Sequence, residues 1–121
     1  MDEWNKGLMA HLGIRILETT PERVVGELQV RDELKTTTAA VHGGTLMAFA
    51  DTVGAIGTAA LGFKTATLES KTNFFAAATG GKLTATATPL HKGKRSHVWQ
   101  TLITDESGRL LSLTIQTQMI L

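Results

Sequence analysis

A long segment that carries a single charge constrains the fold of this chain more than any other feature. Between Lys35 and Lys64 the only formally charged residue is Asp51, and the residues around it are apolar or small. From the pair Gly43-Gly44, with Thr45 as a candidate N-cap, to about residue 62, this segment is predicted to be one helix without a polar face. Such a helix is usually buried on most sides, so the rest of the chain has to surround it.

Segments with the period of two that is typical of strands lie on both sides of this helix. Two are predicted within 14–31, joined by a turn at 20–22, and four more at about 65–75, 82–90, 96–104 and 109–120. Residues 105–108 are typical of a hairpin turn, and we expect the last four strands to form a meander. The chain is thus predicted to be a single α+β domain, 1–121, in which a curled antiparallel sheet surrounds one long central helix.

Two further local features complete this prediction. Residues 2 to about 12 indicate a short helix with Trp4, Leu8 and Leu12 on one side. Within the long helix, small residues such as Gly54 and Gly57 would let other elements approach the helix backbone closely.

The composition excludes several classes of function. The formal net charge is +1, which provides no basic footprint for nucleic acid. Cysteine is absent, which excludes disulfides, thiolate metal sites and cysteine nucleophiles. Asp51 and its small neighbours make residues 39–63 a poor membrane span, and the acidic N-terminus lacks the layout of a signal peptide. We therefore expect a cytoplasmic protein without a nucleic-acid or membrane partner.

Asp51 lies past the first turn of the predicted helix, too deep to cap it or to interact with its dipole. The positions three and four residues away carry Ala, Met or Gly, so no cation on the same helix can pair with it. A carboxylate among apolar neighbours is costly unless it is hydrogen-bonded or functional, and such a group suits general-base chemistry. The alternative is that Asp51 lies on a solvated stripe with Thr52 and Thr58, or bonds a distant arginine.

The residues His42-Gly43-Gly44 open the helix. Free backbone N–H groups at a helix start can bind an anion or an oxyanion; the alternative is a tight turn with a satisfied histidine. Gly43 and Asp51 are eight residues apart, about 12 Å along a helix, so one helix cannot bring both to the same reacting carbon. If both act on one substrate, a second copy of the chain has to supply one of them, which predicts a dimer with shared sites.

The order His42-Gly43-Gly44 and then Asp51, after an aperiodic loop and within a Gly- and Ala-rich helix, resembles the hotdog-fold acyl-CoA thioesterases. The similarity is greatest to the phenylacetate-pathway and 4-hydroxybenzoyl-CoA thioesterase type, and it covers nearly the whole chain. This resemblance implies a hotdog fold. It also implies hydrolysis of acyl- or aroyl-CoA thioesters without a cofactor, in a homodimer or in a homotetramer built from it.

The resemblance also implies roles for individual residues. The amide of Gly43 would polarise the thioester carbonyl, and Asp51 of the opposing subunit would act as nucleophile or as general base on water. His42 would shape the site, contact the thioester or serve a purely structural role, and Gly44 would line the substrate site. The family commonly has Asn or Gln seven positions before the first glycine. This chain has Thr36 there, whose hydroxyl could hydrogen-bond in its place.

Two further groups are candidate substrate contacts. The predicted loop at 91–95 is typical of a solvated charge run, and the resemblance makes it the place where coenzyme A phosphates would lie. Its cations are Lys92, Lys94 and Arg95. Three aromatic residues could line an acyl or aryl pocket, with at least one of them expected in the core instead. They are Phe63, Phe74 and Phe75.

Two other functions are alternatives. A hydratase or dehydratase of the same fold pairs a histidine with an acid, but its usual loop signatures are not visible. A non-catalytic protein that binds acyl-CoA or a small ligand is favoured by the departure at Thr36. We do not expect a metal centre, because the four histidines are scattered without ligand spacing.

Overall fold

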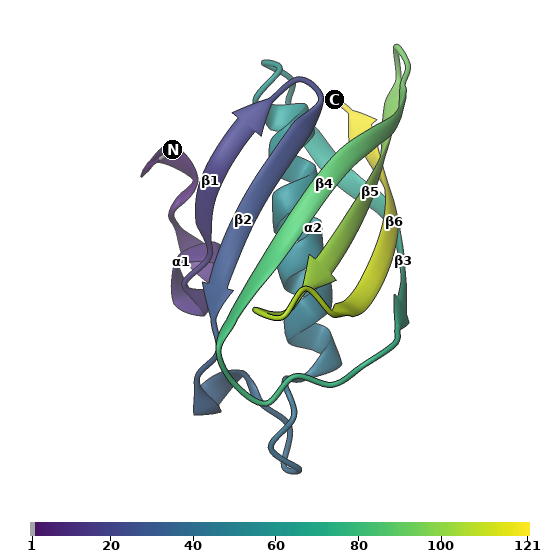
Figure 1. The fold of residues 1–121 in the computed structure, drawn as a ribbon. Coiled ribbons are helices and arrows are strands. Elements are labelled where there is room, and N and C mark those ends of the chain that lie inside the picture. Colours follow the sequence, from purple (N-terminus) through teal and green to yellow (C-terminus); the bar gives the residue numbers. More distant parts are fainter. Residues whose placement is uncertain (1) are drawn as a thin grey trace.

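A computed structural model describes residues 2–121 of the chain. It contains two short 3₁₀ helices, two α-helices and six strands (Figure 1). In chain order these are η1 (Asp2–Trp4), α1 (Gly7–Leu12), β1 (Arg15–Thr20), β2 (Arg23–Gln29), η2 (Asp32–Leu34), α2 (Gly43–Ala59), β3 (Thr65–Phe74), β4 (Lys82–Lys92), β5 (Ser96–Thr104) and β6 (Leu110–Ile120). The predicted α+β fold, with a curled sheet around one long helix, is confirmed.

The strands form one antiparallel sheet in the order β1-β2-β4-β5-β6-β3. The β1–β2 hairpin and the run β4–β5–β6 match the prediction, but the expected meander of four strands is wrong. Strand β3 pairs with β6 at the far edge, because residues 75–81 carry the chain past the N-terminal end of α2 to the other side of the sheet. Backbone hydrogen bonds from Val41 to Ala78 and from Val30 to Gly81 hold this crossing in place.

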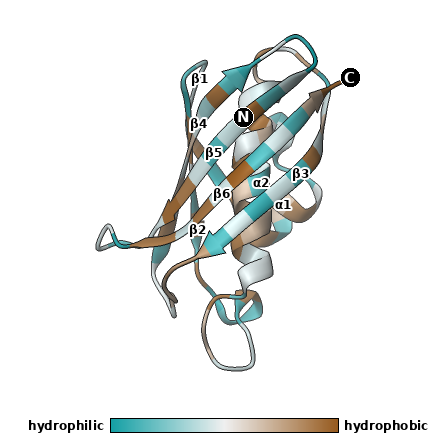
Figure 2. Ribbon diagram, turned by 90° about the vertical axis from the view of Figure 1, so that its right-hand side faces the viewer, coloured by the Kyte–Doolittle hydropathy of each residue, from teal (hydrophilic) through white to brown (hydrophobic). Residues whose placement is uncertain are grey.

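Helix α2 lies against the concave face of the sheet, behind β5, β6 and β3 in Figure 2. A Cβ atom at Gly57 would come within 2.4 Å of the Trp99 ring, and one at Gly54 within 2.4 Å of the Gln116 side chain. The predicted close approach to these glycines is therefore confirmed. In this single chain only the side of α2 that faces the sheet is buried, and the side that carries Met47 and Asp51 is partly open. No helix of residues 2–121 has the length and apolar character needed to cross a membrane.

The short helix α1 begins at Gly7, later than predicted. Because of this shift, Met9 and Leu12 are the buried pair, whereas Leu8 is 58% exposed. The single predicted helix with Trp4, Leu8 and Leu12 on one side is wrong, because Trp4 belongs to the separate helix η1 and Leu8 does not share the burial of Leu12.

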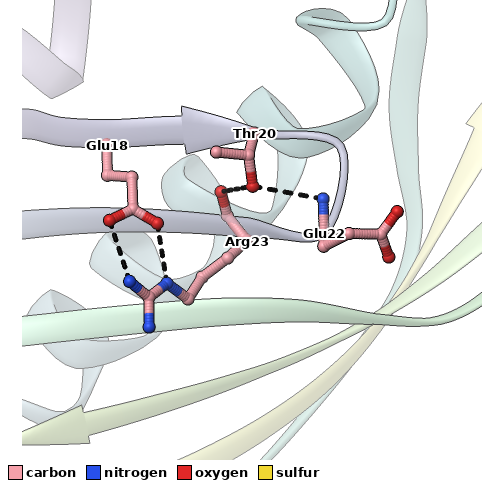
Figure 3. Close-up of polar contacts among 4 residues, drawn as sticks. All are labelled: Glu18, Thr20, Glu22 and Arg23. Atoms are coloured by element: carbon pink, nitrogen blue, oxygen red, sulfur yellow. Dashed lines mark hydrogen bonds and ion pairs between the residues drawn. The ribbon is translucent and has the colours of Figure 1, made fainter.

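The first hairpin is held by polar contacts at its turn (Figure 3). Arg23 donates two hydrogen bonds, of 2.7 and 2.8 Å, to the two carboxylate oxygens of Glu18, and the hydroxyl of Thr20 donates to the backbone carbonyl of Arg23. The hydrogen bonds from Arg23 lower the pKa of Glu18. Exposed pairs of this kind contribute little to stability, so their main effect is to define the hairpin end.

Strand β6 turns its polar side toward α2. Leu113 and Ile115 lie on the outer face of the sheet and are only half-buried. The residues that alternate with them are buried against the helix: Ser112, Thr114, Gln116 and Gln118. The alternation was predicted, and its direction is the reverse of the usual apolar-inward pattern.

A β-bulge at Leu68 divides β3 into two parts. Thr67 pairs with Gln118 and Glu69 with Thr117, which leaves Leu68 without a partner. Because side chains alternate along a strand, the extra residue places Thr67 before the bulge and Phe74 after it on the same, inward face.

A second buried polar cluster lies under the C-terminal half of α2. The Thr58 hydroxyl is 2.9 Å from His97 Nδ1 and accepts a 3.0 Å hydrogen bond from Trp99 Nε1. The Phe63 ring meets the His97 ring edge-on at a centroid distance of 5.5 Å. Burial, with a smaller contribution from the charge of Lys92, lowers the pKa of His97 below its usual 6.5.

This lowered pKa predicts a pH-dependent stability. Between about pH 7.5 and 5.5 the unfolded chain begins to bind a proton at His97, while the folded chain does not. The contribution of His97 to the free energy of unfolding is therefore fully present above its usual pKa, and it is lost as the pH falls toward the lowered pKa of the folded chain. The slope is at most about 1.4 kcal/mol per pH unit, and urea unfolding at a series of pH values measures it. The slope should disappear in His97→Gln, and a constant wild-type midpoint across this range would contradict the prediction.

Candidate active site

The N-terminus of α2 is capped by the side chain of His42. Its Nδ1 atom accepts a 2.7 Å hydrogen bond from the N–H of Gly44, which places the proton of the neutral ring on Nε2. The predicted N-cap at Thr45 is wrong, because the N-cap is His42, three residues earlier, and the Thr45 hydroxyl instead donates to the carbonyl of Leu34. Within residues 2–121 no acceptor takes the N–H of Gly43. This donor, at the positive end of the helix dipole, is free to meet a ligand oxygen.

Gly43 lines an open groove of about 380 Å³ between α2 and the end of β3. The Phe74 ring lies so close that a Cβ atom at Gly43 would be 3.2 Å from it. All side chains around the groove are apolar, and its lining is Val41, Gly43, Leu46, Phe74, Phe75, Ala76 and Ala77. Phe74 and Phe75 are thus at this groove, about half-exposed, while Phe63 lies at the other end of α2 beside His97. Phe63 is also exposed, so the expectation that at least one of the three lies in the core is wrong.

Thr36 lies in the loop that precedes α2. The N–H of Thr36 donates to the carbonyl of Ala40, and its hydroxyl accepts a 3.1 Å hydrogen bond from the N–H of Thr38. The two threonine hydroxyls are also 2.7 Å apart. The loop is therefore a tight turn, closed by bonds between its own residues, and it protrudes at the end of the molecule where α2 begins (Figure 1).

Asp51 is held by two donors from the strands beside it. The Thr67 hydroxyl is 2.5 Å from Asp51 Oδ1 and 2.8 Å from the side-chain oxygen of Gln118, and its one hydrogen makes the shorter bond, to Asp51. Gln116 Nε2 donates a 3.2 Å bond to the same Asp51 oxygen. No residue of the described chain donates to Oδ2, and no cation pairs with the carboxylate. Of the alternatives for Asp51, a bond to a distant arginine is absent among residues 2–121, and the solvated stripe with Thr58 is wrong because that side chain is buried. Asp51 is a hydrogen-bonded, partly open carboxylate.

Thr67 and Gln116 were not predicted as site residues. Both lie on strands far from Asp51 in sequence, and nothing in a single sequence shows where β3 bulges or which side of β6 faces the helix. A weak signal is present in the sequence: two glutamines, separated by Thr117, occupy alternate positions near the end of β6, where a core strand would usually carry apolar residues on its inner face.

The basic loop lies at the opposite end of α2 from Gly43, at the top of Figure 1. Lys92 Nζ contacts the carbonyl of Pro21 and is 3.7 Å from a carboxylate oxygen of Glu22. Lys94 and Arg95 are exposed, and within residues 2–121 neither side chain makes an ion pair. Helix α2 has 17 residues, about 25 Å in length, so one chain does not bring this loop to its own Gly43.

In the described part of the chain, no group of three or more His, Asp or Glu residues is arranged so that it could hold a metal ion.

The comparisons with known proteins identify the family. The thioesterase superfamily matches residues 39–112, which include the N-terminus of α2 and Asp51. The chain belongs to this superfamily, whose reaction class is thioester hydrolysis, and the resemblance inferred from His42-Gly43-Gly44 and Asp51 is confirmed.

Individual proteins agree with this assignment. The 1,4-dihydroxy-2-naphthoyl-CoA hydrolase of Listeria monocytogenes is 32% identical over 114 residues, which are 89% of this chain and 90% of the relative. A crystal structure of a Staphylococcus aureus protein, in a glutamate-to-alanine variant, superimposes with a TM-score of 0.93 at 29% identity and covers 95% of this chain and 98% of the other. The Escherichia coli PaaI protein from the phenylacetic acid degradation operon shares the fold, with a TM-score of 0.93 at 24% identity over 99% of this chain and 88% of PaaI.

The capping role of His42 leads to a stability prediction. His42→Ala removes the acceptor for the Gly44 N–H and should lower the free energy of unfolding by about 0.5–2 kcal/mol. His42→Asn keeps a side-chain acceptor at the N-cap and should retain most of the stability. Urea unfolding of the three proteins measures the difference, and equal stability of His42→Ala and the wild type would contradict the capping role.

Proposed function

We propose that the protein hydrolyses acyl-CoA thioesters, with the Asp51 carboxylate and the Gly43 N–H as the reacting pair. The observation that carries this proposal is the state of these two groups. Gly43 presents an unpaired N–H beside an apolar groove, and Asp51 presents a carboxylate with one oxygen bonded and the other open. A donor for a developing oxyanion and a carboxylate to activate water are the two requirements of thioester hydrolysis.

The chemistry can follow either of two routes. As a general base, Asp51 takes a proton from water while the water oxygen bonds to the carbonyl carbon and negative charge develops on the carbonyl oxygen at Gly43. The C–S bond then breaks, and the coenzyme A sulfur receives the proton from Asp51. As a nucleophile, the carboxylate attacks the carbonyl carbon, the thiolate leaves, and water cleaves the resulting anhydride.

We propose that each site is shared by two copies of the chain, with a homodimer as the minimum unit and a homotetramer built from it as the expected assembly. Gly43 and Asp51 are about 12 Å apart along α2, too far for one reacting carbon. Asp51 lies beside β3, an edge strand, and an unpaired edge is a template for a second strand. Glu69 and Lys71, on the outward face of β3, carry opposite charges that antiparallel copies can pair. An antiparallel β3–β3 contact would turn the N-terminus of the partner helix toward Asp51.

The position of Thr36 supports a role in the same site. The Staphylococcus aureus thioesterase has been crystallised as a glutamate-to-alanine variant and as a glutamine-to-alanine variant, and the two replaced positions are fifteen residues apart. Thr36 and Asp51 are also fifteen residues apart. We propose that Asp51 takes the place of that glutamate and Thr36 the place of that glutamine, with a shorter reach.

For the substrate we propose an apolar acyl or aryl group in the groove at Gly43, against Phe74 and Phe75. His42 would present its Nε2–H near the same place, and Gly44 would contribute by its lack of a side chain, because its N–H is already bonded. Lys94 and Arg95 would contact the phosphates of a coenzyme A bound at the partner's Gly43. Lys92, which is held by the first hairpin, would contribute through its charge. The coenzyme A thioester named for the Listeria relative supports this class.

The first test is release of free thiol from a panel of acyl- and aroyl-CoA thioesters. Asp51→Asn should lower kcat by about 10²–10⁴-fold while substrate binding persists. If the wild type binds acyl-CoA but hydrolyses none of the thioesters, the proposal is overturned and a non-catalytic binding protein is favoured. Equal activity in wild type and variant would remove Asp51 from the reaction.

Mixed assemblies test the shared site. Gly43→Pro removes the N–H, and proline suits the first helical position and the extended backbone of His42 (ψ 136°). Because it also adds a Cβ atom 3.2 Å from the Phe74 ring, Gly43→Ala, which adds that atom and keeps the N–H, is the control. When the Gly43→Pro chain is co-expressed with an Asp51→Asn chain that carries a second tag, mixed dimers can be isolated. If the sites are shared, one of the two sites in each mixed dimer has both an intact Gly43 and an intact Asp51, so the dimer should have about half of the wild-type activity. Mixed dimers as inactive as their parents would place both groups in one chain.

A further inference from the structure

Two glutamines are buried between β6 and α2, in a place where apolar residues usually lie. Gln116 is 1% exposed and Gln118 is 0% exposed. A buried amide needs partners for both its N–H₂ and its oxygen, and an unmet group costs stability. The side-chain oxygen of Gln116 has no partner. Neither amide takes part in the strand pairing itself, so their presence calls for another explanation.

The hydrogen bonds around Gln118 define its orientation. The Thr65 hydroxyl donates to the carbonyl of Met119, so it can only accept from Gln118 Nε2, at 3.0 Å. The oxygen of Gln118 therefore points the other way, and Gln116 Nε2 donates to it at 2.8 Å. Gln118 thus holds the amide group of Gln116 from behind.

The orientation of Gln116 follows from its other contacts. Its Nε2 atom is also 3.2 Å from the backbone carbonyl oxygen of Asp51 and 3.2 Å from Asp51 Oδ1. A flipped amide would bring its oxygen against these two acceptors and against the oxygen of Gln118. The unmet oxygen of Gln116 is therefore the cost of directing its N–H₂ at Asp51.

Helix α2 is shaped to receive this amide. A Cβ atom at Gly54, one turn after Asp51, would lie 2.4 Å from the Gln116 oxygen. Only glycine lets the amide lie against the helix backbone. Gly54, Gln116, Gln118 and Thr65 therefore form one cluster, and among residues 2–121 its only charged contact is the Asp51 carboxylate.

We propose that Gln116, held by Gln118, is a positioning residue for the reaction. Together with Thr67 it ties Oδ1 of Asp51, and this fixes the rotation of the carboxylate so that Oδ2 is the atom that meets water or the thioester. The inference rests on the proposed role of Asp51 and adds the group that aims it. Gln116 does not contact the substrate.

The test is Gln116→Met, which keeps the length of the side chain and removes the amide. We expect kcat to fall at least about tenfold with KM within about twofold, because a misplaced catalytic group lowers the rate more than binding. The midpoint of thermal unfolding should change little, because the variant removes the unmet oxygen of Gln116 and the oxygen of Gln118 still has the Thr67 hydroxyl within 2.8 Å. Gln100→Met is the matched control on the opposite face of the sheet, and it should retain full kcat.

Several outcomes would overturn the inference. An unchanged kcat in Gln116→Met would do so, as would a loss of activity that tracks a loss of folded protein. If that variant does not fold, the side-chain amide signals of Gln116 in a ¹⁵N spectrum of the folded protein decide. They should shift in Asp51→Asn, and unchanged signals would refute the contact. If Asp51→Asn is fully active, the proposed function itself fails, whatever Gln116→Met does.

Discussion

The structure depends on direct contact between the sheet and the backbone of α2. At Gly54 and Gly57 the helix has no side chains, and Gln116 and Trp99 fill the space against its main chain. Because a packed interior tolerates little change in volume, these two contacts define how far the helix sits from the sheet and how it is rotated. The rotation in turn brings Asp51 beside β3 and turns the start of the helix toward the groove at Phe74. Both candidate groups of the site are thus placed by glycines that touch neither.

The start of α2 shows how one short sequence serves structure and chemistry together. His42 satisfies the N–H of Gly44, which would otherwise need water or another cap. That bond leaves the N–H of Gly43, a residue that lines the groove, without an acceptor among the described residues. The histidine and the second glycine therefore secure the helix end, and the first glycine stays available. The motif His42-Gly43-Gly44 therefore has two separate parts: His42 and Gly44 cap the helix, and Gly43 provides a free N–H donor.

Much of the fold was predictable from the sequence. The apolar helix, the first hairpin, the bounds of the last four strands and the turn at 105–108 follow local patterns, and the structure confirms them. The position of β3 was not predictable, because pairing with β6 rather than β4 depends on a path of the chain that has no local signature. The N-cap was missed because a histidine, rather than Thr45, supplies the acceptor. Asp51 and Gly43 stood out by their neighbours in sequence, whereas Thr67 and Gln116 reach Asp51 only through the bulge at Leu68 and the inward polar face of β6.

The bulge at Leu68 has a consequence for how this fold can vary. One part of β3 supplies Thr67 to the carboxylate, and the other supplies Phe74 to the groove at the helix start. A single inserted or deleted residue between them would invert one part relative to the other, because side chains alternate along a strand. Because of this one extra residue in the edge strand, the side chains of Thr67 and Phe74 lie on the same face of the sheet, although they serve two separate places along α2. Length changes are tolerable in the loops of such a protein, but along this strand they would turn either Thr67 away from Asp51 or Phe74 away from the groove at Gly43.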